Sequence, residues 1–287
     1  SIGVGASGDG DGIVVENTGT ITTGGNLSSQ PGGGSATVTG NQISNVYGAA
    51  ANDADGVIAA IGAIETNASA GDGIRVAFVD GDVLIDGNGI VNVSDDGIQV
   101  MSVTGNGPNG GTMMQPGITI ANNVITSVGN GSGAGDGIVV AYTGIADVGS
   151  VAMTGGVLVS GNTVNDVFGD GVDDDDGFSS GDGIRLVFID GDVVVRENTI
   201  ASTGNIANDG IQISIVGKTV QVLDNRLGVG GSIGTGASGD GDGIVISRTG
   251  ALSAGFGSDQ GGQRRRLFLG DRKSTRLNSS HVSEPRM

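Results

Sequence analysis

Two short motifs alternate along residues 1–262, and they constrain the fold more than any other feature. The first motif reads Asp-Gly-Ile-x-aliphatic, and its seven copies begin at Asp11, Asp72, Asp96, Asp136, Asp182, Asp209 and Asp242. The second motif sets two apolar residues ahead of an asparagine and one behind it, and its six asparagines are Asn41, Asn88, Asn123, Asn162, Asn198 and Asn225. Apolar residues at every second position indicate short strands with one buried face.

Strands this short cannot bury an apolar face on their own. Stacking one repeat on the next pairs each strand with its counterpart and buries a continuous Val/Ile core. The shortest interval between two copies of the first motif, from Asp72 to Asp96, is 24 residues, which is enough for one three-sided coil. The sequence therefore predicts an all-β solenoid.

A longer unit of three coils is duplicated. The stretch GDGIRVAFVDGDVLIDGNGI at Gly71 returns as GDGIRLVFIDGDVVVRENTI at Gly181, 110 residues later. The three coils open with GDGIVV, GDGIR and DGIQ in turn, and the first opening returns once more at Gly241 as GDGIVI. We expect the native array to continue beyond these residues, so that the solenoid is truncated at both ends.

Composition excludes several classes of protein. The 59 glycines follow no three-residue period, which excludes collagen, and no apolar stretch is long enough for a membrane-spanning helix. Residues 1–262 hold 6 basic residues against 29 acidic ones, so we expect no nucleic-acid partner and no membrane insertion. Cysteine is absent, which removes disulfides and thiolate metal sites.

Residues 263–287 differ from the rest. They are basic, contain the single histidine, His281, and lack both motifs. The segment DRKSTRLNSSH, Asp271 to His281, resembles the in-frame translation of a sequencing adapter over eleven consecutive residues. Residues 271–287 as a whole fit that origin, so we expect 263–287 to be a non-native or disordered tail and assign it no function.

The alternating motifs of residues 1–262 resemble the right-handed parallel β-helix repeat family, the pectate-lyase-like architecture. The resemblance implies a right-handed parallel β-helix of about six to seven coils. It also implies an asparagine ladder, with amides stacked and hydrogen-bonded between coils, at Asn41, Asn88, Asn123, Asn162, Asn198 and Asn225. Within that family the repeats are most similar to adhesin and autotransporter-passenger regions.

A catalytic site is not predicted. Arg75 with Asp80 and Asp82 has the composition of an arginine and calcium-binding carboxylates for β-elimination, but the trio recurs as Arg185, Asp190 and Asp192. Because a catalytic centre need exist only once, the duplication favours a structural turn. Residues 1–262 contain no histidine and no polygalacturonase-like signature.

The aspartates of the first motif raise a question of charge. If consecutive coils stack in register, Asp72 lies about 5 Å from Asp96. Such a column requires that each carboxylate be hydrogen-bonded, protonated or shared with a cation. Turn hydrogen bonds and calcium both remain open, and the candidate calcium ligands are Asp72, Asp80, Asp82, Asp96, Asp182, Asp190, Asp192 and Asp209.

These observations lead to three functional hypotheses. The first is a structural or adhesive segment of a secreted or cell-surface bacterial protein, whose partner is an extracellular glycan or a surface protein. The second is the scaffold part of a polysaccharide lyase or glycoside hydrolase, and the third is a calcium-stabilised spacer. Tyr47 and Phe168 occupy matching positions after the asparagine strand, as an aromatic sugar platform or as wedges between loop and core.

Overall fold

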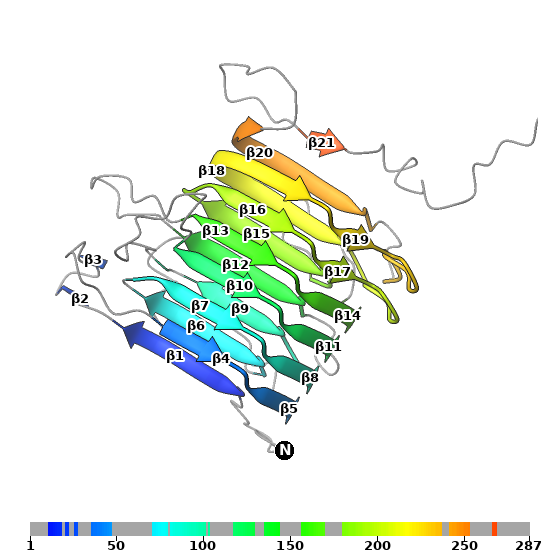
Figure 1. Ribbon diagram of the computed structural model, residues 1–287, viewed down its shortest axis with the longest axis horizontal. Coiled ribbons are helices and arrows are strands. Elements are labelled where there is room, and N and C mark those ends of the chain that lie inside the picture. The colour runs from blue at the N-terminus through cyan, green and yellow to red at the C-terminus, as the bar shows by residue number, and fades with distance from the viewer. Residues whose placement is uncertain are drawn as a thin grey trace, which may run out of the picture.

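The computed structural model shows a parallel β-helix, in which successive coils stack along one axis (Figure 1). It describes residues 11–18, 21–22, 26–27, 36–47, 71–79, 81–101, 103, 117–129, 135–143, 156–169, 180–236, 241–252 and 266–268. All regular structure in these residues is strand. The all-β solenoid expected from the sequence is thereby confirmed.

Each coil contributes one strand to each of three faces. The strands of the first face are β1 (Ile13–Thr18), β6 (Ile74–Val79), β9 (Ile98–Met101), β12 (Ile138–Thr143), β15 (Ile184–Ile189), the first half of β18 (Ile211–Leu223) and β20 (Ile244–Leu252). Those of the second face are β4 (Ala36–Thr39), β7 (Val83–Asp86), β10 (Ile118–Ala121), β13 (Val157–Ser160), β16 (Val193–Arg196) and the second half of β18. Those of the third face are β5 (Gln42–Val46), β8 (Gly89–Val93), β11 (Val124–Val128), β14 (Thr163–Val167), β17 (Thr199–Ile200) and β19 (Arg226–Leu227).

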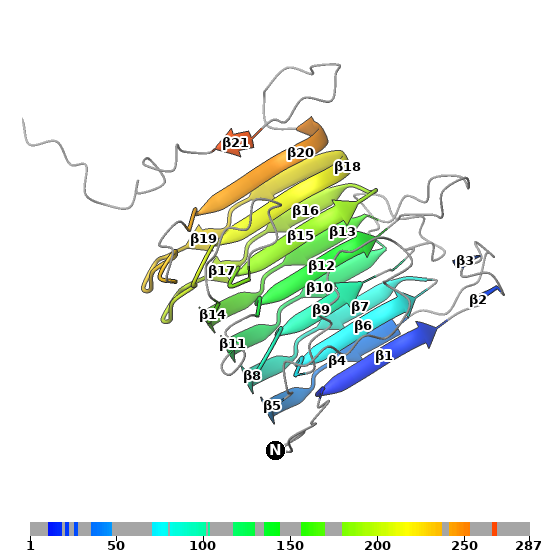
Figure 2. The same cartoon turned by 180° about the vertical axis from the view of Figure 1, so that it is seen from behind.

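These strands make six complete coils and the start of a seventh. The colours in Figures 1 and 2 pass from blue to orange along the stack, so chain order and stacking order are the same. At about 4.8 Å per coil the rod is roughly 30 Å long. Outside the coils, β2 (Ile21–Thr22) pairs antiparallel with β3 (Asn26–Leu27).

The register of the strands places identical motif positions on top of one another. Seven isoleucines form one column on the first face, in the order Ile13, Ile74, Ile98, Ile138, Ile184, Ile211 and Ile244. Five of them, from Ile74 to Ile211, are completely buried. Full burial of an isoleucine contributes about 1.5–3 kcal/mol, so these columns are the main source of stability.

The corner between the second and third faces turns through a left-handed residue. This residue directly precedes each motif asparagine and has a φ between 53° and 67°: Gly40, Gly87, Asn122, Gly161, Glu197 and Asp224. A single left-handed residue redirects the chain without a long loop. The asparagine that follows therefore enters each coil at the same height. We call this turn the asparagine corner.

The corner between the third face and the first face holds the Asp-Gly pair of the first motif. Here the backbones of adjacent coils come so close that a Cβ on Gly137 would overlap the carbonyl oxygen of Gly183 and the side chain of Val164. The same overlap, with the next glycine of the motif, applies at Gly12, Gly73, Gly97, Gly183 and Gly210. Close approach, rather than a special φ, explains why glycine follows aspartate in this motif. We call this turn the aspartate corner.

Part of the basic tail joins the sheet of the first face. Strand β21 (Arg266–Phe268), which belongs to the basic tail, pairs antiparallel with β20. The rest of the tail, including the adapter-like residues 271–287, lies outside the described residues. Within the described part of the chain, no helix has the length and hydropathy needed to cross a bilayer.

Candidate functional site

The six motif asparagines form one continuous ladder at the asparagine corner. The side-chain nitrogen of each asparagine donates to the Oδ1 of the next, at 2.9–3.0 Å, from Asn41 through to Asn225. The backbone N–H of each one also donates to that same oxygen. A second N–H of Asn123 donates to the carbonyl of Ile85 in the preceding coil. Asn88, Asn123, Asn162 and Asn198 are at most 1% exposed, so the ladder is part of the core.

The seven motif aspartates form a second column at the aspartate corner. In each step, Oδ1 of one aspartate accepts the backbone N–H of the aspartate in the next coil, at 2.6–3.2 Å. Asp11 and Asp136 also accept the N–H of the glycine that precedes the next aspartate, Gly71 and Gly181. One oxygen of each of the six aspartates from Asp11 to Asp209 therefore bridges two coils.

The aspartate column is buried, and burial changes its chemistry. Asp72 and Asp182 are 0% exposed, Asp136 is 1% exposed, and Asp96 and Asp209 are 6% exposed. Loss of hydration raises the pKa of Asp72, Asp96 and Asp182 well above its ordinary value. Neighbouring carboxylates raise it further, since each is held near another negative charge.

Two arginines partly offset this charge. On the first face the residue after the motif isoleucine runs Val14, Arg75, Gln99, Val139, Arg185, Gln212, Val245 from coil to coil. Arg185 places Nε 2.9 Å from Oδ2 of Asp136, and Arg75 places a guanidinium nitrogen 4.0 Å from Oδ2 of Asp11. The Nε–H group of Arg185 makes no hydrogen bond to a described residue, so its contact with Asp136 is an electrostatic one. Each arginine lowers the pKa of the aspartate in its own coil, Asp72 or Asp182.

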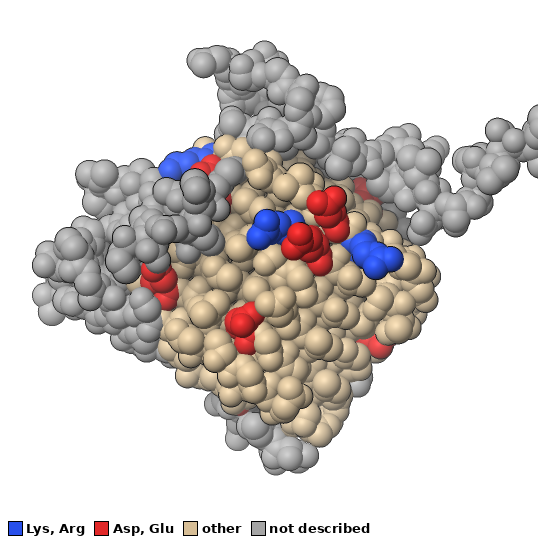
Figure 3. Space-filling model, in the orientation of Figure 1, with Lys and Arg blue, Asp and Glu red and all other residues tan. Residues whose placement is uncertain are grey.

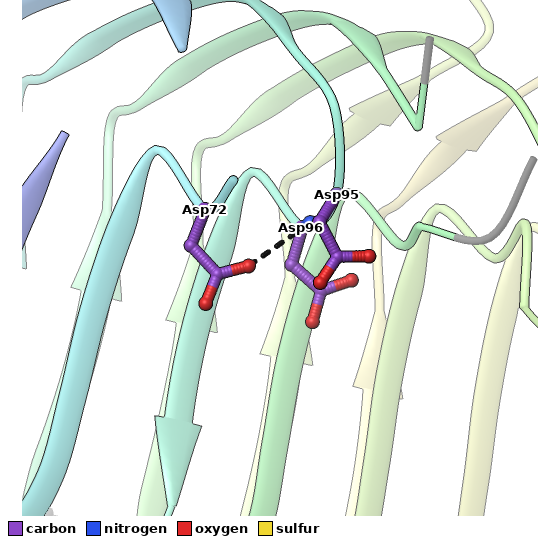
Figure 4. Close-up of side chains that lie close together, drawn as sticks. All are labelled: Asp72, Asp95 and Asp96. Atoms are coloured by element: carbon purple, nitrogen blue, oxygen red, sulfur yellow. Dashed lines mark hydrogen bonds between the residues drawn. The ribbon is translucent and has the colours of Figure 1, made fainter. Parts of the chain in front are cut away.

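One part of the column gathers three carboxylates. Asp72, Asp95 and Asp96 each offer an oxygen within 4.8 Å of the other two (Figure 4). All three are buried, at 0%, 5% and 6% exposed. Asp72 and Asp96 were expected from the motif, but Asp95 was not, because it stands one position before the motif. Comparison of SDDGIQV at Ser94 with ANDGIQI at Ala207 would have drawn attention to it.

The structure does not bring the other predicted ligands to this site. Asp190 and Asp192 follow β15, at the corner between the first and second faces, whereas Arg185 is the second residue of that strand. Oδ1 of Asp192 accepts the backbone N–H of Thr219 in the next coil, which is a turn contact. Asp82, directly before β7, has its backbone carbonyl bonded to the N–H of Ala36, and Asp80 lies outside the described residues.

Asp182 and Asp209, in contrast, are adjacent in the aspartate column. Oδ1 of Asp182 accepts both the N–H of Asp209 and the side-chain amide of Asn208.

The two aromatic residues do not form one platform. Tyr47 follows β5 in the first coil, and its hydroxyl accepts a 2.6 Å hydrogen bond from the side-chain amide of Asn92. Phe168 follows β14 in the fourth coil and is 46% exposed. Three coils separate them, a distance of about 14 Å along the axis. Two stacked sugars of one chain are therefore not the natural ligand of this pair.

No family model, curated protein or solved structure matches this chain in comparisons with known proteins.

Proposed function

We propose that this chain is a structural and adhesive β-helical segment of a secreted or cell-surface bacterial protein, of the adhesin or autotransporter-passenger type within the pectate-lyase-like architecture. Its role is to extend a rod of stacked coils and to present the outer faces of that rod to an extracellular glycan or a surface protein.

The observation that carries this proposal is the place of the recurring charged residues. Asp72, Asp96, Asp182, Arg75 and Arg185 are all at most 6% exposed and are engaged between coils. A lyase or glycosidase acting on a long polymer requires its carboxylates and arginine at an open surface. Residues that are duplicated and sealed between coils support stacking rather than catalysis.

The outer surface offers a second line of support. On the second face one outward row of adjacent coils is Thr37, Leu84, Thr119, Leu158, Val194 and Gln221, none of which is charged. The row that ends the same strands carries two charged residues of opposite sign, Asp86 and Arg196. In the view of Figure 3, charged side chains of the described residues are sparse. A flat, mostly uncharged surface suits contact with a neutral partner more than with a polyanion.

Binding and turnover assays on the full chain test this proposal. The chain is passed over immobilised polysaccharides and extracellular-matrix proteins, and the same polysaccharides in solution are followed for reducing ends and unsaturated products. We expect retention on at least one surface and no product. Turnover would overturn the proposal in favour of the carbohydrate enzyme. Absence of both would reduce the role to that of a spacer.

The proposed cellular location, secreted or at the cell surface, is tested separately by sequencing the source locus through both sides of this reading frame. An export signal and a surface anchor in the same frame are the expected result. A frame with neither would contradict a surface role while leaving the fold unaffected.

A further inference from the structure

The two copies of the three-coil unit differ at one position of the aspartate column. In the first unit Asp95 precedes Asp96, and in the second Asn208 precedes Asp209. The two positions are structurally equivalent. The backbone N–H of Asp95 donates to the carbonyl of Gly71, and that of Asn208 to the carbonyl of Gly181. Their own carbonyls accept from Gly129 and Gly234, both at 3.0 Å.

In the second unit this position supplies a hydrogen-bond donor. The side-chain nitrogen of Asn208 donates to Oδ1 of Asp182 at 2.9 Å, and it thereby partly satisfies a buried carboxylate. Asp95 has no such donor when it is ionised. It adds a third negative charge beside Asp72 and Asp96, and among the neighbouring charges it is the largest cause of the raised pKa of both. The first unit thus holds three carboxylates beside one arginine, and the second holds two.

A buried amide beside the three carboxylates points independently to a ligand. Gln99 is 2% exposed, and its side-chain nitrogen donates to Oδ2 of Asp96 at 3.2 Å, which fixes the amide at this cluster. Its Oε1 has no hydrogen-bond partner among the described residues, and neither has Oδ2 of Asp72. Oε1 of Gln212 and Oδ2 of Asp182 are left in the same way in the second unit, so the feature that distinguishes the first unit is the third carboxylate, Asp95, beside these acceptors. A buried acceptor that is left unsatisfied destabilises the folded state. Oxygen acceptors without donors are the ligands that a hard divalent cation prefers.

We propose that Asp72, Asp95 and Asp96 bind one calcium ion between the second and third coils, with the amide oxygen of Gln99 as a further ligand. Calcium–oxygen distances are about 2.3–2.6 Å, so two oxygens on one ion lie up to about 5 Å apart. The separations within 4.8 Å meet this limit without a backbone shift. The ion neutralises the excess charge of the first unit and ties two coils together.

The equivalent position of the second unit binds no ion in this proposal. Asn208 removes one carboxylate, and its N–H₂ group donates to Asp182 where a cation would otherwise approach. The inference goes beyond the adhesive role and does not depend on it, because an inter-coil ion would stabilise the rod whatever the rod binds.

The chain supplies its own matched variants for the test. Asp95→Asn gives the first unit the residue that the second unit already accommodates, so the fold is retained. Asn208→Asp gives the second unit the full set of carboxylates. The full-length chain and both variants are stripped with a chelator and titrated with calcium chloride by calorimetry. Thermal melts are recorded in calcium and in chelator.

We expect Asp95→Asn to bind one calcium ion fewer than the unmodified chain, and Asn208→Asp one more. In saturating calcium the melting temperature of the unmodified chain rises by about 5 °C or more through this site, and Asp95→Asn loses that increment. In chelator the order is reversed, and Asp95→Asn melts higher because a buried repulsion is removed. Any ion bound elsewhere is common to the three proteins and cancels in the comparison.

Two results would overturn the proposal. One is an unchanged number of bound ions in Asp95→Asn. The other is a melting temperature that Asp95→Asn raises equally with and without calcium, which would assign the cluster to shared protons instead. Either result leaves the adhesive role intact, since that role is judged by retention on a surface.

Discussion

Arg185 on β15 places its Nε 2.9 Å from Oδ2 of Asp136, one coil earlier along the rod. Both side chains are at most 6% exposed, so their mutual attraction is only weakly screened. Oδ1 of the same Asp136 accepts the N–H groups of Gly181 and Asp182. One carboxylate therefore joins two coils by charge and by hydrogen bonds together.

Removing that carboxylate is expected to destabilise the rod strongly. Asp136→Ala leaves a buried guanidinium without this partner and the buried N–H of Asp182 without its acceptor, at a cost of about 3–5 kcal/mol. The N–H of Gly181 keeps its hydrogen bond to the carbonyl of Gly135. Asp11→Ala is the control, because Asp11 lies in the first coil and its contact with Arg75 is 4.0 Å. Urea unfolding, monitored by circular dichroism, gives the free energy of unfolding of both variants. Equal losses in the two variants would show that the close ion pair adds nothing.

The glycine of the aspartate corner gives a prediction with an internal control. A Cβ at Gly137 would overlap the carbonyl oxygen of Gly183, and backbone in the next coil cannot move aside locally. We expect Gly137→Ala to cost about 3 kcal/mol or more. Gly243 occupies the same motif position, yet a Cβ there meets nothing within 4 Å. Gly243→Ala should leave the unfolding midpoint almost unchanged, and a similar loss in both variants would refute close approach as the reason for glycine.

The centre of the asparagine ladder should be far less tolerant than its end. Asn123→Ala removes the acceptor of two N–H groups of Asn88 and the donor to Asn162, all buried. Each group left unsatisfied costs about 1–3 kcal/mol. In Asn41→Ala, Oδ1 of Asn88 still receives a backbone N–H, from residue 41 itself. Denaturation should show a loss several times smaller for this end variant. A wild-type midpoint for Asn123→Ala would contradict the energetic role of the ladder.

The columns of the core could be predicted from the sequence because a solenoid places like positions one above another. Once the spacing of the motifs is known, the neighbours of Asn123 or Ile98 in adjacent coils follow without further information. The same rule favours contacts between coils over contacts along the sequence. Sequence proximity groups Arg75 with Asp80 and Asp82, whereas the structure also gives Arg75 an ion-pair contact with Asp11, in the preceding coil.

The three-carboxylate cluster was less accessible to sequence reasoning. The shared motif is Asp-Gly-Ile, and the difference between Asp95 and Asn208 lies one residue ahead of it. Burial of the aspartates could not be read from the sequence either. Seven aspartates at the same position of a repeated motif predict a column, but whether water reaches that column depends on how the corners close. The acidic composition therefore overstates the charge that the coils expose.

The buried aspartates are expected to give this protein an unusual dependence on pH, and Asp182 isolates the effect. Burial, Asp136 and Asp209 raise its pKa in the folded state, while Arg185 and the N–H of Asp209 oppose them. A raised pKa means that the folded chain holds this proton more tightly than the unfolded chain. The stabilisation is therefore fully present below the unfolded pKa of about 3.9, and it is lost as the pH rises through the folded value.

Asp182→Asn tests this sign directly. The amide oxygen can still accept from Asp209 and Asn208, but the side chain no longer ionises. Relative to the unmodified chain, the variant should gain stability at neutral pH and gain little below about pH 4. Melting temperatures of the variant and the unmodified chain, measured in chelator from acid to neutral pH, give the difference in stability at each pH. A difference that is constant across the series, or that favours the unmodified chain at neutral pH, would mean that Asp182 is ionised and well solvated in the folded state.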